Sequence, residues 1–405
     1  MTVQKITPFA PWPYFAEDEV AAAAQVLRSG KVNYWTGEEC RLFEQEFAAY
    51  LGCRHAIALA NGTLALELAL HAFDIGAGDE VITTSRTFIA SAGSIVLRGA
   101  TPVFADVDAN SQNLCLETLQ RALTPKTRAI IAVHLAGWPC EMDAIMDFAE
   151  QHGLVVIEDC AQAHGATYQG RPAGSLGHAA AFSFCQDKIM TTGGEGGMLI
   201  LHDEARWKKA WAYKDHGKSY DAVYHRAHPA GFRWLHESFG SNWRMTEMQA
   251  AIGRLQLKKL PDWIKKRREH AAMLSDGLAP LPGLRVTIPP AYIGHAYYKY
   301  YAFVKPEILR AGWDRDRIMA AINQAGIPCF SGSCSEVYLE KAFDASLARP
   351  SPRLAVAQAL GETSLMFLVH PTLTRQNMLD TVAVVTSILS QHHNHDTVWS
   401  KKCQK

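Results

Sequence analysis

Seven short apolar runs recur along the first half of the chain, and each has the length of a single buried β-strand. They occupy residues 55–60, 80–84, 101–106, 128–135, 154–158, 179–184 and 197–202. The first five alternate with helical patterns, as βαβ units do around a largely parallel sheet. We therefore expect an α/β fold with a mostly parallel, seven-stranded sheet.

Helical spacing precedes and follows this region. It extends over Glu17–Ser29 and Glu38–Leu51, and each pattern ends at a glycine. Residues 206–239 are rich in aromatic and basic side chains and predict a long loop that reaches the substrate. A further helix is expected from Thr246, and Pro261 should break it. Its apolar face should comprise Met248, Ala251, Ile252, Leu255 and Leu257.

The last part of the chain has a different organisation. A strand-like segment at 295–304 and a helical pattern at 315–325 predict a smaller C-terminal α/β domain. We place a large domain at residues 1–260, the small domain at 261–390 and a polar, disordered tail at 391–405. The histidines of the tail are only a weak indication of metal binding, and we expect no metal site.

The charge balance limits the classes of partner. The 405 residues include 40 basic and 40 acidic side chains, with an isoelectric point near 7.3. This balance gives no electrostatic footprint for nucleic acid or for an anionic membrane, so we expect a small-molecule partner.

Cysteine usage and hydropathy indicate the compartment. Nine scattered cysteines without a CxxC pair are typical of a reduced protein and argue against a disulfide framework or a structural zinc site. No run of eighteen apolar residues and no signal-peptide core are present. These features predict a cytoplasmic protein.

Residues 182–197, FSFCQDKIMTTGGEGG, place one lysine between two apolar strands. Lys188 is followed by a cluster of glycines, which let backbone approach a flat ligand closely. An exposed lysine in a β-turn is the alternative interpretation. The choice between them depends on the residues upstream.

Glu158 and Asp159 stand at the carboxyl end of the apolar run 154–157. Ligands of α/β sheets bind at this end. Pyridoxal phosphate needs a lysine that forms a Schiff base and a carboxylate that keeps the pyridine nitrogen protonated. The pair therefore predicts pyridoxal phosphate as the cofactor, with Lys188 and Asp159 as catalytic residues.

Asn61, Gly62 and Thr63 follow the first strand and open a helix. The free amides and the positive end of the helix dipole suit a phosphate, although the same residues are also favoured in an ordinary helix N-cap. Strand alternation turns the hydroxyl of Ser183 away from its phenylalanine neighbours and toward this polar site. His134 lies in an apolar run and is interpreted as a core histidine, with a catalytic role left open.

The motifs EDCAQAHGA, FSF with Lys188 shortly after it, GGEGG and NWRMTEMQAAIGRLQL occur together in this chain. Together they resemble the DegT/DnrJ/EryC1/StrS family of sugar aminotransferases. The resemblance extends from about Trp12 to about Leu373. It implies the pyridoxal phosphate-dependent transferase fold type I, with a small domain that closes over the site.

The resemblance implies roles for further residues. Gly62 and Thr63 would bind the cofactor phosphate together with Ser183. Asn242 would reach across a dimer interface to the phosphate of the neighbouring subunit, so that active sites are shared in a homodimer.

Around the cofactor ring, the resemblance implies that Phe88 stacks on one face and Ala161 lies on the other. Gln162, three residues past Asp159, would reach the phenolic oxygen.

The implied activity moves an amino group from an amino acid, by family habit L-glutamate, to a keto sugar of cell-surface polysaccharide or lipopolysaccharide biosynthesis. The substrate is either a nucleotide-linked keto-deoxysugar or an oxidised octulosonate such as 8-oxo-Kdo. The stretch Cys329–Tyr338 replaces a turn found in many relatives and suggests an atypical substrate pocket. One alternative is a sugar dehydratase, against which Lys188 argues because dehydratases of the family carry histidine there. Another is a regulator that binds pyridoxal phosphate without turnover.

Overall fold

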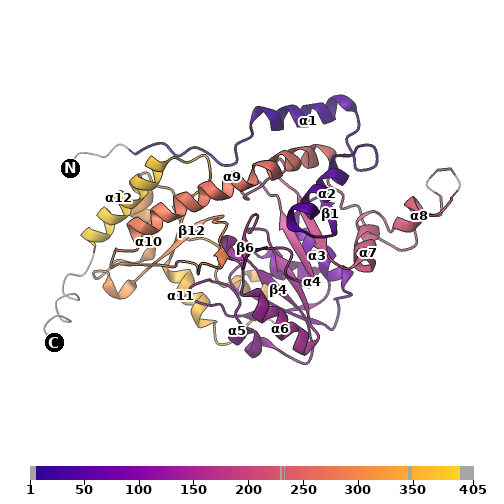
Figure 1. Ribbon diagram of the computed structural model, residues 1–405. Helices are drawn as coiled ribbons and strands as arrows, with labels where there is room; N and C mark the ends of the chain where they lie inside the picture. The colour runs from indigo at the N-terminus through magenta and orange to yellow at the C-terminus, as the bar shows by residue number, and fades with distance from the viewer. Residues whose placement is uncertain (1–5, 229, 232, 345–348, 393–405) are drawn as a thin grey trace.

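The seven predicted strands form one sheet in the computed structural model of the chain, which describes residues 6–228, 230–231, 233–344 and 349–392 (Figure 1). The strands are β1 (His55–Leu59), β2 (Glu80–Thr84), β3 (Thr101–Ala105), β4 (Thr127–Val133), β5 (Val155–Asp159), β8 (Ala179–Ser183) and β9 (Gly197–Leu201). Their order across the sheet is β1-β9-β8-β5-β4-β2-β3. The predicted fold class is confirmed.

One strand of this sheet runs against the others. Strand β9 pairs antiparallel with both β1 and β8, whereas the remaining neighbours pair in parallel. Parallel neighbours need a long crossover, usually a helix. Residues 184–196, which join β8 to β9 and carry Lys188, form a short connection without a helix, and β9 returns beside β8 in the opposite direction. The connections from β1 through to β5 use α3 (Gly62–Ala72), α4 (Ala90–Leu97), α5 (Leu116–Ala122) and α6 (Met142–His152). The connection from β5 to β8, residues 160–178, is long but contains no helix.

Aromatic side chains from the N-terminal region seal one part of the sheet. In α2 (Glu39–Leu51), Phe47 packs edge-on against Phe182 of β8, with ring centroids 5.0 Å apart. Phe43 of the same helix lies 5.4 Å from Phe184. These rings are fully buried, so they anchor the strand that leads into the lysine loop.

A second, antiparallel sheet has the order β10-β12-β14-β13 and its own apolar core. Its strands are β10 (Leu284–Val286), β12 (Tyr300–Val304), β13 (Cys329–Phe330) and β14 (Ser364–Phe367). The accompanying helices are α10 (Arg315–Gln324), α11 (Ala355–Thr363) and α12 (Arg375–Gln391). A small third sheet comprises β6 (Thr167–Tyr168), β7 (Arg171–Pro172) and β11 (Ile293–Gly294). Short 3-10 turns lie at Leu135–Gly137, Pro306–Ile308, Val337–Leu339 and Lys341–Phe343.

Helix α9 (Glu247–Leu278) passes through Pro261 without interruption, so the predicted break is wrong. A proline inside a helix costs about 3 kcal/mol. Here Leu257, Leu260 and Ile264 are buried on either side of it, and their packing holds the helix together. The predicted domain boundary at 260 and 261 falls inside α9. Figure 1 shows this helix extending from α1 (Glu17–Ser29) and α2 to α12.

The predicted apolar face of α9 is correct only in part. Ala251 and Leu257 are buried, whereas Met248, Ile252 and Leu255 are half-buried. The buried face instead includes polar and charged members such as Gln256 and Arg267.

Residues 206–239 are not one long loop, which corrects a second prediction. Helix α7 (Glu204–Lys214) begins at Asp203, whose carboxylate accepts a hydrogen bond from the amide of Arg206, and buries Ala210 and Trp211. A short helix, α8 (Tyr220–Tyr224), follows it. The helix was missed because its lysines and tryptophans do not follow a clear apolar and polar pattern in the sequence, although one side of it is buried.

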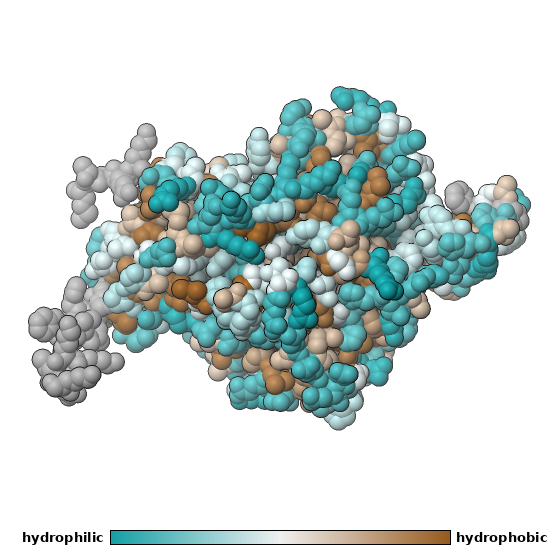
Figure 2. Space-filling view, in the orientation of Figure 1, coloured by the Kyte–Doolittle hydropathy of each residue, from teal (hydrophilic) through white to brown (hydrophobic). Residues whose placement is uncertain are grey.

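The surface in Figure 2 intersperses hydrophilic and hydrophobic residues. Within the described residues, no helix has both the length and the apolar character needed to cross a membrane. Eight cysteines are free thiols, and Cys403 lies outside the described residues, as does the predicted tail from residue 393 onward.

Candidate active site

A cavity of about 530 Å³ opens at the carboxyl ends of the central strands and the N-terminus of α3. Nine of the ten residues predicted to bind the cofactor line it: Asn61, Gly62, Thr63, Phe88, Asp159, Ala161, Gln162, Ser183 and Lys188. Asn242 does not line it, and its side chain is exposed. The lining also includes Ser91, Cys185 and Glu195, which the sequence did not single out.

Lys188 presents a free amine to this cavity. Its backbone is fixed, because its amide donates to the carbonyl of Cys185 at 3.1 Å and its own carbonyl accepts from Nε1 of Trp12 at 2.8 Å. Its Nζ lies 3.8 Å from Oδ1 of Asp187 and 5.0 Å from the ring centroid of Tyr298. No described residue hydrogen-bonds to Nζ, so the amine is available for a bond to a ligand.

Asp159, the last residue of β5, holds its carboxylate with both oxygens occupied. Oδ2 accepts from the hydroxyl of Ser91 at 2.7 Å, and Oδ1 accepts from the amide of Ala161 at 3.1 Å. Burial raises the pKa of Asp159, against the hydrogen bonds of Ser91 and Ala161 and the charge of Lys188. A cation bound beside Asp159 would relieve this cost of burying the carboxylate.

The N-terminus of α3 supports both interpretations offered for Asn61. Its Oδ1 accepts from the amide of Leu64 at 3.0 Å, which is an N-cap bond. The amides of Gly62 and Thr63 have no acceptor among the described residues. These amides, at the positive end of the helix dipole, form an anion site. A side chain at Gly62 would place its Cβ 2.6 Å from Cβ of Ser183, so only glycine allows this close approach.

A backbone amide fixes the orientation of the Gln162 side chain. Its Oε1 accepts from the amide of Ala136 at 2.7 Å, which leaves Nε2 as a donor at the cavity. Phe88 is 67% exposed at the rim, and Ala161 lies in the same cavity wall. An oxygen acceptor and a flat ring would both be accommodated here.

The cavity therefore combines a free amine, a buried carboxylate, an amide donor and an anion site at a helix N-terminus. Pyridoxal phosphate has an aldehyde, a ring nitrogen, a phenolic oxygen and a phosphate, and each has a partner of the matching kind. The residues present fit this cofactor.

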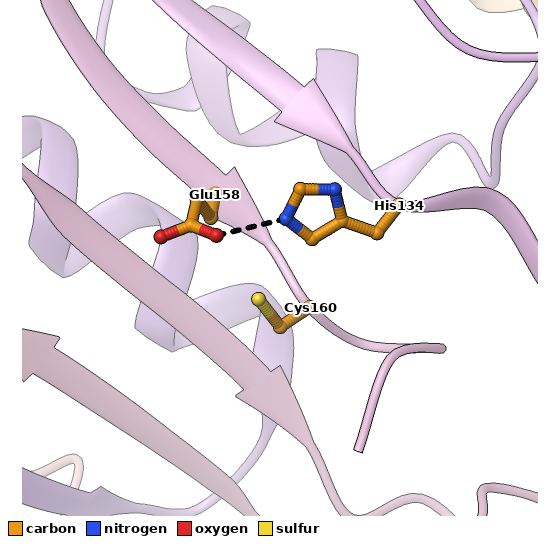
Figure 3. A group of neighbouring side chains, drawn as sticks. All are labelled: His134, Glu158 and Cys160. Atoms are coloured by element: carbon orange, nitrogen blue, oxygen red, sulfur yellow. Dashed lines mark hydrogen bonds and ion pairs between the residues drawn. The ribbon is translucent and has the colours of Figure 1, made fainter. Parts of the chain in front are cut away.

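His134, Glu158 and Cys160 form a buried cluster whose ligand atoms lie within 4.8 Å of one another (Figure 3). The carboxylate of Glu158 already accepts four hydrogen bonds, from Nε2 of His134 and from the amides of Gly174, Leu176 and Gly177, at 2.7 to 2.9 Å. Burial, followed by the charge of Glu158, raises the pKa of Cys160 to about 12. Because its carboxylate already accepts these four hydrogen bonds, the cluster forms a buried structural network.

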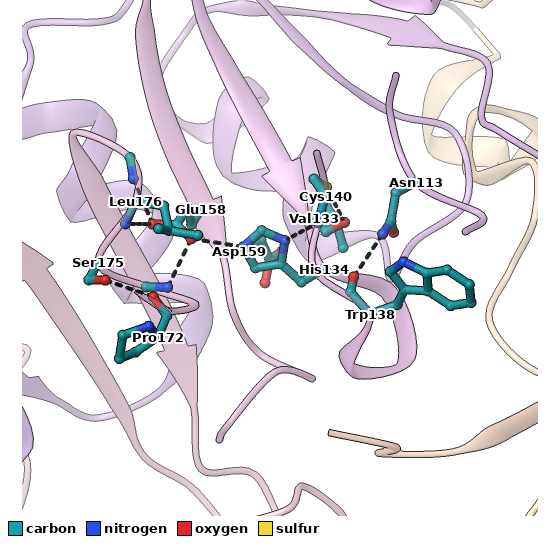
Figure 4. A network of polar contacts seen from close by, with 12 residues as sticks. Asn113, Val133, His134, Trp138, Cys140, Glu158, Asp159, Pro172, Ser175 and Leu176 are labelled. Atoms are coloured by element: carbon teal, nitrogen blue, oxygen red, sulfur yellow. Dashed lines mark hydrogen bonds and ion pairs between the residues drawn. The ribbon is translucent and has the colours of Figure 1, made fainter. Parts of the chain in front are cut away.

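The same cluster supports the active-site strand (Figure 4). Nδ1 of His134 accepts from the amide of Cys140 at 3.0 Å, so the ring proton is on Nε2 and is donated to Glu158. The backbone amide of His134 donates to the carbonyl of Asp159 at 3.2 Å. His134 is thus a satisfied core histidine that helps to fix the position of Asp159.

A second cavity of about 710 Å³ adjoins the first and shares Phe88, Gln162 and Lys188 with it. Its far wall comes from the second sheet and from the stretch 329–338, which the sequence identified as unusual. That wall includes Phe330, Ser333, Cys334 and Met366, and the cavity is completed by Asp187 beside Lys188 and by Tyr298 and Lys299 just before β12. No sequence motif marked Ser91, Tyr298 or Lys299, because only the folded arrangement brings them to Lys188.

The chain was compared with known proteins. The profile of the DegT/DnrJ/EryC1/StrS aminotransferase family matches residues 13–386. A relative, the spore coat polysaccharide biosynthesis protein SpsC of Bacillus subtilis, is 40% identical over 79% of this chain and 82% of its own length. GDP-perosamine synthase of Caulobacter vibrioides is 39% identical over 86% of this chain and 89% of its own.

Solved structures of aminotransferases are also similar to this chain. An aminotransferase from Psychrobacter cryohalolentis is 58% identical, with a TM-score of 0.94, over 96% of this chain and all of its own. A sugar aminotransferase from Streptococcus pneumoniae, solved in its PMP form, is 25% identical, with a TM-score of 0.86, over 95% of this chain and 99% of its own. Pyridoxal phosphate and its amine form are therefore the cofactor of such proteins.

Proposed function

Since the chain belongs to the DegT/DnrJ/EryC1/StrS aminotransferase family and is a pyridoxal phosphate-dependent aminotransferase, we propose that it moves an amino group from L-glutamate to a keto sugar linked to a nucleotide. The observation that carries this proposal is the shared cavity of Lys188 and Asp159. One offers a free amine and the other a buried carboxylate, beside an anion site on α3.

We assign the covalent and proton-transfer roles to Lys188. Its Nζ would hold the cofactor at the aldehyde carbon. Once the amino donor has displaced it, the amine would remove the proton from the donor's α-carbon and carry it for return. Bound pyridoxal phosphate supplies the ring that accepts the electron pair left on the donor carbon.

The other residues of the cavity would hold the cofactor and orient it. Asp159, fixed by Ser91, keeps a proton on the ring nitrogen. The amides of Gly62 and Thr63 bind the phosphate, with Ser183 beside them. We further propose that Gln162 donates Nε2 to the phenolic oxygen, and that Phe88 and Ala161 flank the ring.

In the first half L-glutamate would give up its amino group, take an oxygen from water and become 2-oxoglutarate. In the second half the sugar carbonyl would take up that amino group and lose its oxygen as water. Lys188 would move the same proton in the reverse direction. One lysine therefore serves both halves.

The choice of a nucleotide-linked sugar is supported by GDP-perosamine synthase, a relative of nearly the same length. The relatives named above include no octulosonate aminotransferase, so the comparisons do not favour 8-oxo-Kdo. We also propose a homodimer, because the side chain of Asn242 is exposed outside its own cavity and is free to reach a second copy.

Borohydride reduction of the holoenzyme followed by peptide mapping tests the assignment of Lys188. We expect the reduced adduct on Lys188, no label and no turnover in Lys188→Ala, and unchanged labelling in Lys126→Ala at an exposed control position. Adding L-glutamate should bleach the cofactor absorbance. Label on another lysine, or full turnover in Lys188→Ala, would overturn the mechanism. Cofactor binding without bleaching by any amino acid would favour the regulator.

A further inference from the structure

Around Lys299, which lines the 710 Å³ cavity, the cations that act on its charge outnumber the acids that do so. Asp187 is the acid that acts on Lys299, whereas Lys188 and Arg267 add positive charge. The carboxylate of Asp187 is already shared. It accepts the hydroxyl of Tyr298 and lies 3.8 Å from Nζ of Lys188 and 4.0 Å from Nζ of Lys299. One carboxylate thus lies beside two ammonium groups, and its charge also acts on the guanidinium of Arg267.

Nζ of Lys299 has no hydrogen-bond acceptor among the described residues. Apart from Asp187, its neighbour is the ring of Tyr298, with the centroid 4.7 Å away. The side chain is only 16% exposed and lines the 710 Å³ cavity next to Lys188. An ammonium group this buried normally has a closer anionic partner.

Hydrogen bonds to the two preceding residues fix the position of the Lys299 backbone. Nη1 of Arg267 donates to the carbonyls of Tyr297 and Tyr298, each at 3.2 Å. The amide of Tyr298 donates to the carbonyl of Ala136 at 2.8 Å. The backbone leading into Lys299 is therefore held both to α9 and to the 3-10 turn that follows β4, which fixes the start of its side chain at the cavity.

We propose that Lys299 is the anion-binding residue of the substrate cavity, where its ammonium group pairs with a carboxylate or phosphate oxygen of a substrate. The inference rests on the proposed aminotransferase function. Both substrates of that reaction offer such an oxygen, because the amino donor carries carboxylates and a nucleotide-linked sugar carries phosphates. The bound oxyanion would supply the negative charge that the cluster lacks.

The titration of Lys299 agrees with this assignment. Burial lowers its pKa to about 8, and Arg267 and Lys188 add to the effect while Asp187 opposes it. His370 is a further neighbour, because the charge of Lys299 helps to lower its pKa. The other titratable residues that line the same cavity are Tyr298, Tyr301, Cys334 and Glu340. Anion binding should weaken as pH rises through 8, because the ammonium proton is then lost.

Half-reactions of the holoenzyme test the proposal. L-glutamate is titrated against the cofactor absorbance, and the amine form is titrated with nucleotide-linked keto sugars. In Lys299→Met we expect the Kd of one substrate to rise about tenfold to a hundredfold, as for loss of a charge-assisted bond. A change on the glutamate side assigns a carboxylate, and a change on the sugar side assigns a phosphate. Lys299→Arg should restore much of the affinity. Lys305→Met, on the same segment outside the cavity, is the control.

Anion binding at Lys299 can also be measured without turnover, so the test of Lys299 does not depend on the aminotransferase reaction. Succinate and pyrophosphate, tested one at a time, should raise the Tm of the holoenzyme, and at least one should lose this effect in Lys299→Met. Unchanged Kd values and unchanged protection in Lys299→Met would overturn the assignment. An altered Kd that Lys299→Arg does not restore would show a structural role and overturn it as well.

Discussion

The hydroxyl of Ser91 donates a hydrogen bond of 2.7 Å to Oδ2 of Asp159, joining α4 to the end of β5. The same hydroxyl lies 2.8 Å from Oγ1 of Thr87. Because the amide of Ala161 occupies the other carboxylate oxygen, Asp159 cannot rotate without losing a bond. Ser91 thus sets the orientation of the carboxylate that faces the cofactor cavity.

Replacing Ser91 with alanine should weaken cofactor binding while leaving the fold intact. Loss of one hydrogen bond to a charged group costs about 1.5–3 kcal/mol, which corresponds to roughly tenfold or more in the Kd of pyridoxal phosphate. Titration of the apoenzyme by absorbance would measure it. Ser94→Ala is the control, since the hydroxyl of Ser94 donates to a backbone carbonyl in the same helix. Equal Kd values for the two variants would contradict the role of Ser91.

Gly62 lies at the cofactor site and Gly93 lies away from it, so the same substitution at the two positions should have opposite effects. Gly62→Ala would force a Cβ to 2.6 Å from Cβ of Ser183 and displace the anion site, so we expect at least a tenfold loss of cofactor affinity. Gly93 lies inside α4, and a Cβ added there would meet no atom within 4 Å. Gly93→Ala should instead stabilise the protein by about 0.5–1 kcal/mol. Cofactor titration and urea unfolding of both variants would test this contrast, which an unaltered cofactor affinity in Gly62→Ala would contradict.

The sheet was predictable because each of its strands is a short apolar run with turn residues on both sides. The antiparallel direction of β9 could not be predicted from the missing helix between 184 and 196, because residues 160–178 also lack a helix and yet join the parallel strands β5 and β8. The prediction at Pro261 was wrong because local propensity opposed packing that spans the whole molecule, and the burial of Leu260 and Ile264 prevailed. Helix α7 was missed since its one-sided burial is not visible among its charged residues.

The candidate site was predictable where chemistry and strand ends coincide. Lys188, Asp159 and the turn at Asn61 each follow an apolar run, so sequence order alone placed them at one edge of the sheet. Ser91 and Lys299 could not be found in this way. Ser91 lies inside a helix pattern, and Lys299 directly precedes β12 of a different sheet and comes close to Lys188 only through tertiary packing.

Glu158→Gln should destabilise the protein strongly without touching the cofactor. Its carboxylate accepts four hydrogen bonds, and an amide nitrogen in place of one oxygen would face donors. Breaking such a buried, charged network costs about 3 kcal/mol or more. Urea unfolding would measure it, with Glu150→Gln on the exposed face of α6 as the control. A loss below 1 kcal/mol relative to this control would show that the network is not important for stability.

His164 should make the folded state sensitive to acid. It is fully buried between Phe182 and Phe184, with ring centroids 5.4 and 5.6 Å away, and neither ring nitrogen has a hydrogen-bond partner among the described residues. Burial, aided by the charge of Lys188, lowers its pKa to about 3. Between pH 6.5 and 3 the unfolded chain therefore binds a proton at His164 that the folded protein does not bind, so stability must fall as pH falls below 6.5.

His164→Phe should remove this contribution. At about 1.4 kcal/mol per pH unit, the unfolding free energy lost between pH 7.5 and 5.0 should shrink by about 2 kcal/mol in the variant. Phenylalanine needs no hydrogen bond and suits the aromatic surroundings, so stability at pH 7.5 should be kept. Urea unfolding at both pH values gives the difference, with His202→Phe at an exposed position as the control. If His164→Phe and His202→Phe lost equal stability on acidification, His164 would not be the acid-sensitive group.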